Sequence, residues 1–134
     1  MAGVLVDSNV LLDVLTEDPL WLEWSSSALA RTAETEVLII NPLIYAEVSV
    51  RFERIEELDA AFPVSLFRRD GLPWEAGFLA EKCFRAYRRR GGTRRSPLPD
   101  FYVGAHAAIR GHALLTRDGA RYRTYFPALE LIAP

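Results

Sequence analysis

Residues 4–12 read Val-Leu-Val-Asp-Ser-Asn-Val-Leu-Leu, and the fold prediction starts from this stretch. Its first three residues, Val4 to Val6, form a continuous apolar run, which is typical of a strand buried on both faces. Asp7 and the two polar residues after it favour the N-cap of a helix, and the apolar residues that follow have helical spacing. A buried strand that leads directly into a helix is the repeating unit of parallel α/β sheets. The stretch therefore predicts an α/β fold.

The rest of the chain alternates between strand and helix patterns in the same way. The further predicted strands are Val37–Ile40, Phe62–Phe67, Ala113–Thr116 and Leu129–Ile132. The further predicted helices are an aromatic stripe from Trp21 to Leu29, a segment capped by Asn41-Pro42, Pro73 to about Tyr87, and about Pro99 to Arg110. Gly91-Gly92 and Gly111 end the last two helices. We predict one α/β domain over residues 1–134, with α/β/α layers and a central, mainly parallel sheet of about five strands.

Composition limits the classes of protein to which the chain can belong. With 134 residues, 50% hydrophobic and 25% charged, it has the profile of a globular domain that buries a core without disulfides. Cys83 is the only cysteine, which suits a reducing compartment, so we expect the cytoplasm. The start of the chain has no basic n-region, and no run reaches the ~18 apolar residues of a membrane span, so we expect no signal peptide and no membrane contact. The net charge of −2 means that any contact with nucleic acid requires a local basic patch.

Four carboxylates stand out at positions where the local pattern requires an apolar residue or a simple cap. Asp7 ends the first strand, and Asp118 follows the fourth predicted strand. Asp100 lies in the first turn of a predicted helix, and Glu47 lies inside the apolar stripe of the helix after the second strand. In an open parallel sheet, strand ends and helix starts meet at one edge. We therefore expect all four acids to converge there.

Crowded carboxylates must share protons or bind a hard cation, because mutual repulsion otherwise raises their pKa values. Carboxylate oxygens alone favour Mg²⁺ or Mn²⁺ over zinc, and such ions serve the hydrolysis of phosphate esters. The neutral oxygens of Ser8, Asn9 and Thr116 are placed to orient the water or the phosphate. No His or Cys cluster with zinc spacing competes. His106 and His112 flank one predicted helix and are expected to be surface or packing residues.

Each acid also has a purely structural interpretation. Asp7 and Asp100 suit helix N-termini, and Asp118-Gly119 is a common turn pair. Glu47 can extend to the surface or meet an arginine there. The joint placement of all four at one sheet edge favours the functional interpretation.

Taken together, these segments resemble a PIN-domain protein and, more narrowly, the VapC-type toxins of bacterial toxin–antitoxin pairs. The segments that carry the resemblance are Val-Asp-Ser-Asn-Val-Leu-Leu at 6–12, Ala46-Glu47, Pro99-Asp100-Phe101 with its Ala-rich helix, and Leu115-Thr116-Arg117-Asp118. They resemble the four family motifs in order and spacing, over essentially the whole chain. Each segment alone is a weak signal, whereas the set of four is fairly specific.

The resemblance implies a Mg²⁺-dependent endoribonuclease, with Mn²⁺ as a substitute ion. It also implies a homodimer and a small cognate antitoxin that docks over the site and keeps the enzyme inactive. The acids carry over as metal ligands or acid–base groups, and two neutral residues carry over as supporting polar groups. These are Asp7, Glu47, Asp100 and Asp118, with Thr116 and Asn9 in support.

A basic segment near the end of the longest predicted helix is the candidate for binding the phosphates of the RNA backbone. Its arginines are Arg88, Arg89, Arg90, Arg94 and Arg95. Arginine pairs bidentately with phosphate, and a local patch can offset the overall negative charge. A solvated helix end is the structural alternative. For an antitoxin or dimer surface, the candidates are Trp21, Trp24 and Phe101, although aromatic residues at helical spacing are more often core.

Two other functions have partial support. An aspartate after the first strand of a parallel sheet also occurs in haloacid dehalogenase-like phosphatases and in phospho-accepting receiver domains. Those phosphatases need a second acid two residues on, where this chain has Asn9, and receivers need a late lysine, whereas Lys82 inside a helix is the only lysine. A PIN-like scaffold that binds RNA or protein without cutting is the non-enzymatic alternative. The complete set of acids argues against that scaffold.

Overall fold

Five short parallel strands form one central sheet. The computed structural model describes residues 1–134. The strands are β1 (Val4–Val6), β2 (Leu38–Ile40), β3 (Phe67–Arg69), β4 (Ala113–Leu115) and β5 (Leu131–Ile132). Their order in the sheet is β3-β2-β1-β4-β5, and every neighbouring pair is parallel. β1 is therefore the central strand, and its burial agrees with its continuous apolar run.

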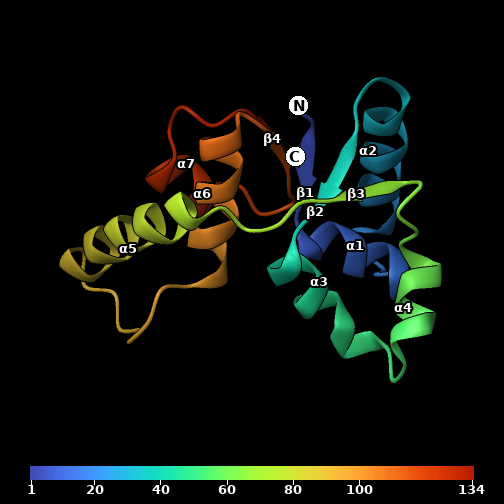
Figure 1. The fold of residues 1–134 in the computed structure, drawn as a ribbon, viewed down its shortest axis with the longest axis horizontal. Helices are drawn as coiled ribbons and strands as arrows, with labels where there is room; N and C mark the ends of the chain where they lie inside the picture. Colours follow the sequence, from blue (N-terminus) through green and yellow to red (C-terminus); the bar gives the residue numbers. More distant parts are fainter.

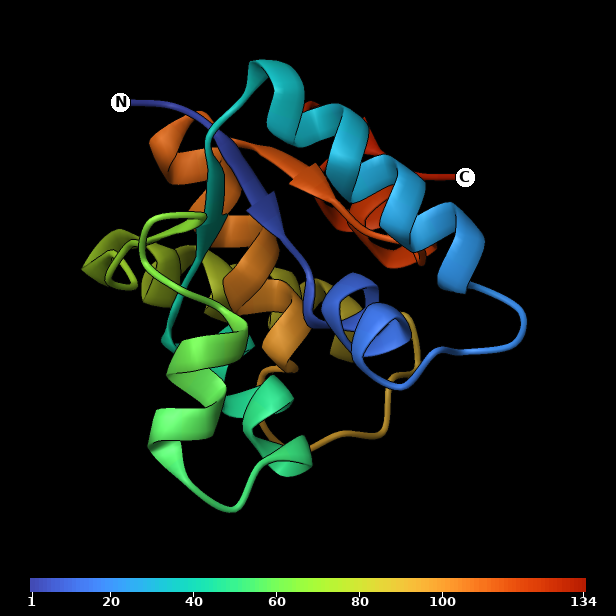
Figure 2. The same ribbon diagram turned by 90° about the vertical axis from the view of Figure 1, so that its right-hand side faces the viewer.

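Helices cover both faces of this sheet. They are α1 (Ser8–Leu15), α2 (Leu22–Thr35), α3 (Pro42–Val48), α4 (Ile55–Ala61), α5 (Trp74–Arg89), α6 (Pro99–Arg110) and α7 (Ala120–Tyr125), with a 3₁₀ turn at Ser49–Arg51. The sheet separates α1 and α2 from α5, α6 and α7 (Figure 1). Figure 2 shows the same layers from the side, with α2 in front of the strands and α6 behind them. The predicted α/β/α architecture with a parallel sheet is confirmed. None of the helices has the length and apolar character that crossing a membrane requires.

Capping residues fix where several helices begin and end, as the sequence pattern predicted. Asp7 has an extended backbone, and its Oδ1 accepts the N–H of Ser8 at 2.9 Å where α1 begins. Asn41 Oδ1 accepts the N–H of Ile44 at 2.9 Å and caps α3. Gly111 ends α6 with a φ of 69°, a left-handed conformation that glycine adopts without strain.

The third strand lies later in the chain than the pattern predicted. The pattern places a strand over Phe62–Phe67, but β3 starts only at Phe67. Pro63 has no N–H to donate to a strand ladder, and its carbonyl accepts from Leu66 and Phe67 in a turn. Val64 and Leu66 are exposed, so their apolar side chains do not mark a buried strand. The preceding residues form α4, a helix that the pattern did not reveal.

The chain leaves β1 and β4 toward opposite faces of the sheet, and this divergence positions the site. The two strands are neighbours, with Val6 opposite Leu115. β1 continues into α1 on one face, whereas β4 continues toward α7 on the other. Ligand sites of open parallel sheets form at such a point, beyond the carboxyl ends of the strands. The residues that stand there are Asp7 and Thr116.

Candidate metal centre

Asp7 lies at the carboxyl end of β1 and is almost fully buried, with 4% of its surface exposed. Its Oδ1 accepts from the backbone N–H of Ser8. Its Oδ2 accepts from two hydroxyl groups, Thr116 at 3.0 Å and Tyr122 at 2.9 Å. These three donors fix the orientation of the carboxylate. Each carboxylate oxygen offers about two lone-pair sites, so Oδ1 can still accept one further partner.

The surroundings of Asp7 disfavour its negative charge. Burial raises the pKa of Asp7 to about 6, and the charges of Asp100 and Glu47 add to the increase. The hydrogen bonds from Tyr122 and Thr116 lower the pKa, but they do not compensate for burial. A nearby positive charge would therefore stabilise the ionised form.

Glu47 reaches the same edge of the sheet from α3. Its side chain is half-buried, and Oε1 accepts from Ser8 Oγ at 3.0 Å. Burial raises the pKa of Glu47 and the charge of Asp100 adds to this, whereas the hydrogen bond from Ser8 lowers it. The buried residues of α3 are Ile44 and Val48. Glu47 thus lies at the margin of the apolar stripe, not inside it as the pattern suggested.

Asp100 enters from the first turn of α6. Its negative charge raises the pKa values of both Asp7 and Glu47. Its Oδ2 lies 3.2 Å from Nη1 of Arg121 on α7. The structure therefore brings three of the four predicted acids into one electrostatically coupled group, which we call the acid cluster: Asp7, Glu47 and Asp100.

The fourth acid, Asp118, has an exposed side chain that makes no hydrogen bond or ion pair. Its backbone N–H donates to Thr116 Oγ1 at 3.2 Å. The same hydroxyl donates to Asp7 and accepts from Asn9 Nδ2 at 3.1 Å. Asn9 Oδ1 in turn accepts the N–H of Arg117 at 3.3 Å. The loop after β4 is thereby fixed relative to Asp7, and Asp118 lies at the rim of the acid cluster.

Tyr122 contacts the acid cluster although nothing in the sequence pattern indicated it. It is 1% exposed, and its hydroxyl donates to Asp7. Burial and the charges of the three acids raise its pKa well above the usual value, so the hydroxyl stays protonated and remains a donor. The only sequence hint is its position a few residues after Asp118. No periodicity distinguishes Tyr122 from the neighbouring Tyr125.

The donor set of the acid cluster suits a hard divalent cation. The charge of Asp100 raises the pKa values of Asp7 and Glu47, so a bound cation would remove repulsion that the fold otherwise tolerates. Oxygen ligands without nitrogen or sulfur favour Mg²⁺ or Mn²⁺. The residues present therefore fit the ion that the sequence resemblance implies.

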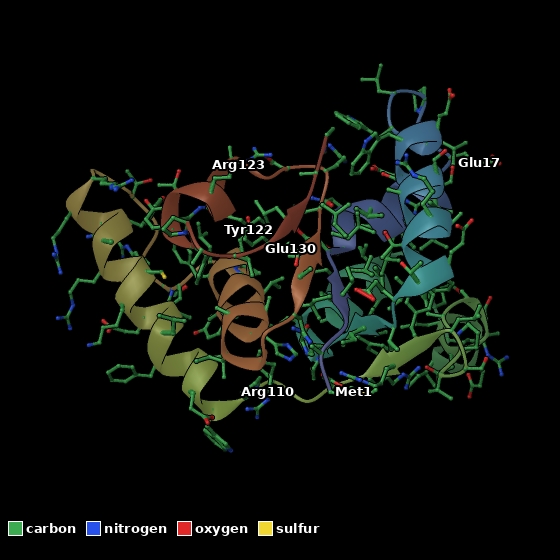
Figure 3. The ribbon with its side chains drawn as sticks, turned by 90° about the horizontal axis from the view of Figure 1, so that it is seen from above. Met1, Glu17, Arg110, Tyr122, Arg123 and Glu130 are labelled. Atoms are coloured by element: carbon green, nitrogen blue, oxygen red, sulfur yellow. The ribbon has the colours of Figure 1, made fainter.

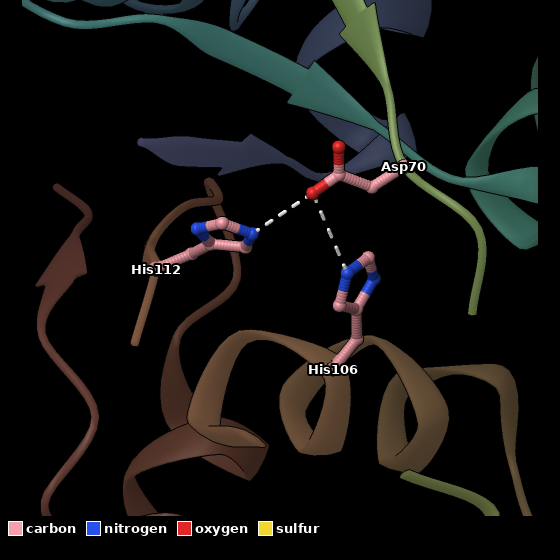
Figure 4. A group of neighbouring side chains, drawn as sticks. All are labelled: Asp70, His106 and His112. Carbon is pink, nitrogen blue, oxygen red and sulfur yellow. Dashed lines mark hydrogen bonds and ion pairs between the residues drawn. The ribbon is translucent and has the colours of Figure 1, made fainter. Parts of the chain in front are cut away.

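A second group of titratable side chains lies between α6 and the sheet: Asp70, His106 and His112 (Figure 4). Asp70 Oδ2 is 3.1 Å from Nε2 of His112 and 4.0 Å from Nε2 of His106. One ligand atom from each residue lies within 4.8 Å of the others, a spacing that could hold a metal. Both histidines are buried, so of the two expected placements, surface or packing, the structure confirms packing. They are polar members of the core.

Proton positions argue against a metal in this second group. The N–H of Gly3 donates to His112 Nδ1 at 3.1 Å. Asn41 uses its Oδ1 to cap α3, so its Nδ2 donates to His106 Nδ1 at 3.0 Å. A neutral imidazole whose Nδ1 accepts a hydrogen bond carries its proton on Nε2, and that nitrogen then has no lone pair for a metal. His112 therefore donates to Asp70, whereas the buried Nε2 of His106 has no hydrogen-bond partner.

Comparison with known protein families matches the PIN domain over residues 4–127, nearly the whole chain. The chain belongs to the PIN-domain family. Comparison of this PIN domain with curated proteins found no match.

Solved structures similar to this PIN domain share its fold at low sequence identity. VapBC2 from Rickettsia felis, bound to a DNA fragment from its promoter, has a TM-score of 0.72 at 14% identity, with 98% of each chain covered. VapBC-1 from nontypeable Haemophilus influenzae has a TM-score of 0.72 at 13% identity, covering 97% of this chain and 96% of that one. A toxin–antitoxin complex from Klebsiella pneumoniae has a TM-score of 0.70 at 18% identity, with the same coverage of 97% and 96%. At these identities the likeness concerns the fold alone.

The basic segment of this PIN domain is exposed and free of ion pairs. It comprises Arg88, Arg89, Arg90, Arg94 and Arg95, at the end of α5 and in the loop that follows. Arg88 Nη1 donates to the carbonyl of Arg94 at 2.9 Å, and the guanidinium of Arg90 lies 5.4 Å from the ring centre of Tyr125. The loop leads directly to Asp100.

The aromatic residues considered for a partner surface divide between core and surface. Phe101 is fully buried, so its assignment to such a surface is wrong. Trp21 and Trp24 are partly exposed and pack edge to face, with ring centres 6.2 Å apart. The most exposed aromatic side chains instead lie on α5, namely Trp74 and Phe78.

Proposed function

We propose that this PIN domain is a metal-dependent endoribonuclease that hydrolyses phosphodiester bonds of RNA, and that it is the toxin of a toxin–antitoxin pair. The observation that supports cleavage most directly is the coupling of Asp7, Glu47 and Asp100 beyond the carboxyl end of β1. Burying acids whose charges repel one another costs stability. A divalent cation bound for catalysis would offset that cost, and this explains why the three acids lie together.

Mg²⁺ is the proposed cofactor, with Mn²⁺ as a substitute. Asp7, Glu47 and Asp100 would hold it, and Asp118 at the rim is the fourth candidate ligand. When bound, such an ion lowers the pKa of water and neutralises charge on the phosphate.

The side chains of the chain itself orient the reactants and move protons. Tyr122 and Thr116 hold Oδ2 of Asp7 in place. Glu47 uses Oε1 to accept from Ser8, which leaves Oε2 to accept a proton from the attacking water. The water oxygen bonds to phosphorus while the bond from phosphorus to the leaving ribose oxygen breaks, and that oxygen takes up a proton from solvent.

The basic segment, Arg88 to Arg95, is the proposed contact for the RNA backbone. Its exposed arginines have no acidic partners, and the loop that carries two of them leads into Asp100. Arginine forms bidentate contacts with phosphate. This local charge would offset the net charge of −2 of the whole chain.

A small cognate antitoxin and a second copy of the chain are the proposed protein partners. The similar structures from Rickettsia felis and Haemophilus influenzae are VapBC proteins, and the one from Klebsiella pneumoniae is a toxin–antitoxin complex. In this chain, Trp74 is 95% exposed and Phe78 is 69% exposed, which provides apolar surface for a partner. An RNA substrate would place the protein in the cytoplasm, as the single Cys83 led us to expect.

Labelled single-stranded RNA incubated with the protein and Mg²⁺ or Mn²⁺ tests the proposal. Cleavage that EDTA and Asp7→Asn both abolish supports the nuclease, and Glu75→Gln, an exposed acid on α5, serves as the control. RNA binding without cleavage, unaffected by EDTA, favours a scaffold instead. Phosphorylation of Asp7 during incubation with a phosphoryl donor favours the phosphatase or receiver function.

A further inference from the structure

Helix α7 presents two consecutive side chains to the acid cluster. Tyr122 points inward to Asp7, whereas Arg121 lies at the surface with Nη1 3.2 Å from Asp100 Oδ2. The side chains of Arg121 and Asp100 are 41% and 37% exposed. Arg123 lies on the outer side of α7, away from Tyr122 (Figure 3). Of these three neighbours on the helix, only Arg121 places a positive charge at the mouth of the site.

The other arginine next to the acid cluster, Arg117, forms an ion pair with an acid outside the cluster. Arg117 Nε lies 2.9 Å from Oδ2 of the buried Asp13, and its guanidinium lies 5.4 Å from the ring centre of Trp21. Arg121, in contrast, makes one hydrogen bond, to Asp100. A guanidinium carries five N–H donors, so most of those on Arg121 remain available to a ligand.

We propose that Arg121 binds the scissile phosphate of the RNA, an inference that rests on the proposed nuclease function. An exposed ion pair is weak, so Arg121 can exchange Asp100 for another anion easily. A cation bound by the acid cluster takes up the charge of Asp100 that attracts Arg121. The guanidinium then stands beside the place where the phosphate must lie to be cut.

Arginine is suited to this task because its fork of donors matches phosphate oxygens and it stays protonated at every relevant pH. Negative charge that develops on the phosphate during hydrolysis strengthens such a contact in the transition state. The effect of Arg121 should therefore fall mainly on kcat. A contact made equally in the ground state would instead change KM.

Three variants test this role: Arg121→Ala, Arg121→Lys and, as the matched control on the same helix, Arg123→Ala. In cleavage of single-stranded RNA with Mg²⁺, Arg121→Ala should lower kcat roughly 100-fold, the scale for loss of one donor to a developing oxyanion. Its KM should change much less. Arg121→Lys should retain intermediate activity, and millimolar guanidinium should restore part of the activity of Arg121→Ala. Arg123→Ala should match the wild type in kcat and in melting temperature.

A second measurement does not depend on cleavage. Fluorescence anisotropy reports the affinity for labelled single-stranded RNA when Ca²⁺ replaces Mg²⁺. Arg121→Ala should weaken this affinity by a much smaller factor than it lowers kcat, in line with its small effect on KM, and should reduce the slope of log affinity against log salt by about 0.7, the contribution of one phosphate contact on a single strand. Arg123→Ala should leave both quantities close to those of the wild type.

Two outcomes would overturn the assignment of Arg121. The first is an Arg121→Ala variant that cuts and binds RNA as well as the wild type. The second is a variant that binds Mn²⁺ more tightly and cleaves faster, because Arg121 would then only compete with the metal for Asp100. If the wild type itself cuts no RNA, the nuclease function fails. An RNA affinity that falls in Arg121→Ala but not in Arg123→Ala would then still support the phosphate contact, and equal affinities would refute it.

Discussion

The hydroxyl of Tyr122 donates to Oδ2 of Asp7 across 2.9 Å and links helix α7 to the end of strand β1. The two residues are 115 positions apart in the chain, and both are buried. A buried hydrogen bond to a carboxylate belongs to the stronger class of hydrogen bonds. The orientation of Asp7 therefore depends on how α7 packs. The same helix presents Arg121 to Asp100, so α7 influences two of the three clustered acids.

Tyr122→Phe removes this donor and keeps the ring in the core. We expect RNA cleavage to fall about 10–100-fold, the loss typical when a group that orients a metal ligand is removed. Because the Tyr122 hydrogen bond lowers the pKa of Asp7, the acid limb of the pH–rate profile should move to higher pH. Steady-state kinetics across mildly acidic and neutral pH measure both effects, with Tyr125→Phe as the control. An unchanged rate and profile would show that Asp7 is oriented without this bond.

Glu47→Gln replaces a carboxylate with a neutral amide that can still accept from Ser8. Burial raises the pKa of Glu47, so without metal the variant should be as stable as the wild type or more stable by ~0.5 kcal/mol, since solvent screens this half-exposed group. Mg²⁺ should stabilise the variant less, because one ligand is lost. Thermal melts with and without Mg²⁺ measure both, and Glu75→Gln is the control. A variant that gains as much from Mg²⁺ as the wild type would exclude Glu47 from the ligand set.

Asp7 and His106 give the metal-free protein opposite dependences of stability on pH. The pKa of Asp7 rises from 3.8 to about 6 on folding, so the folded state binds more protons in this interval and stability falls as pH rises. The pKa of His106 falls from 6.5 to about 4 because of burial, so the unfolded state binds more protons and stability rises with pH. In the wild type, the contributions of Asp7 and His106 to the pH dependence of the unfolding free energy largely cancel.

Single substitutions should reveal each effect separately. Asp7→Asn retains the effect of His106, so its unfolding free energy should rise by on the order of 1–3 kcal/mol between pH 4 and 6.5. His106→Gln retains the effect of Asp7, so its unfolding free energy should fall between pH 3.8 and 6. Urea unfolding in the presence of EDTA measures these slopes. Parallel curves for the wild type and both variants would contradict the assignment.

Arg117 and Asp13 attach the loop after β4 to α1. The carboxylate of Asp13 is buried and accepts from Arg117 Nε and, at 2.7 Å, from Ser25 Oγ. Arg117→Ala leaves this charge without its cation, which should cost about 2–3 kcal/mol of stability. Asp13→Asn combined with Arg117→Gln removes both charges and should recover part of the loss. Urea unfolding of the single and double variants decides this, and a double variant less stable than Arg117→Ala would refute the pairing.

Local sequence patterns were sufficient to predict the helix ends that depend on interactions within one helical turn. The caps at Asp7 and Asn41 and the stop at Gly111 depend on side chains or backbone angles within one helical turn. The strand predicted over Phe62–Phe67 starts too early because Val64 and Leu66 are exposed, and only Phe62 and Phe67 at the two ends of the segment are buried. Exposed and buried apolar side chains look the same in a sequence, so burial cannot be read from composition there.

The alternation of strand and helix follows from the amino-acid sequence, and it predicts the edge of the sheet at which Asp7, Glu47 and Asp100 lie. The contacts of Tyr122 with Asp7 and of Arg121 with Asp100, the exposed position of Asp118 and the pairing of Asp70 with the buried His112 depend on how the helices pack on the sheet. The physical reason is that such contacts depend on distance and burial between residues far apart in the chain. No periodicity or local propensity encodes those quantities.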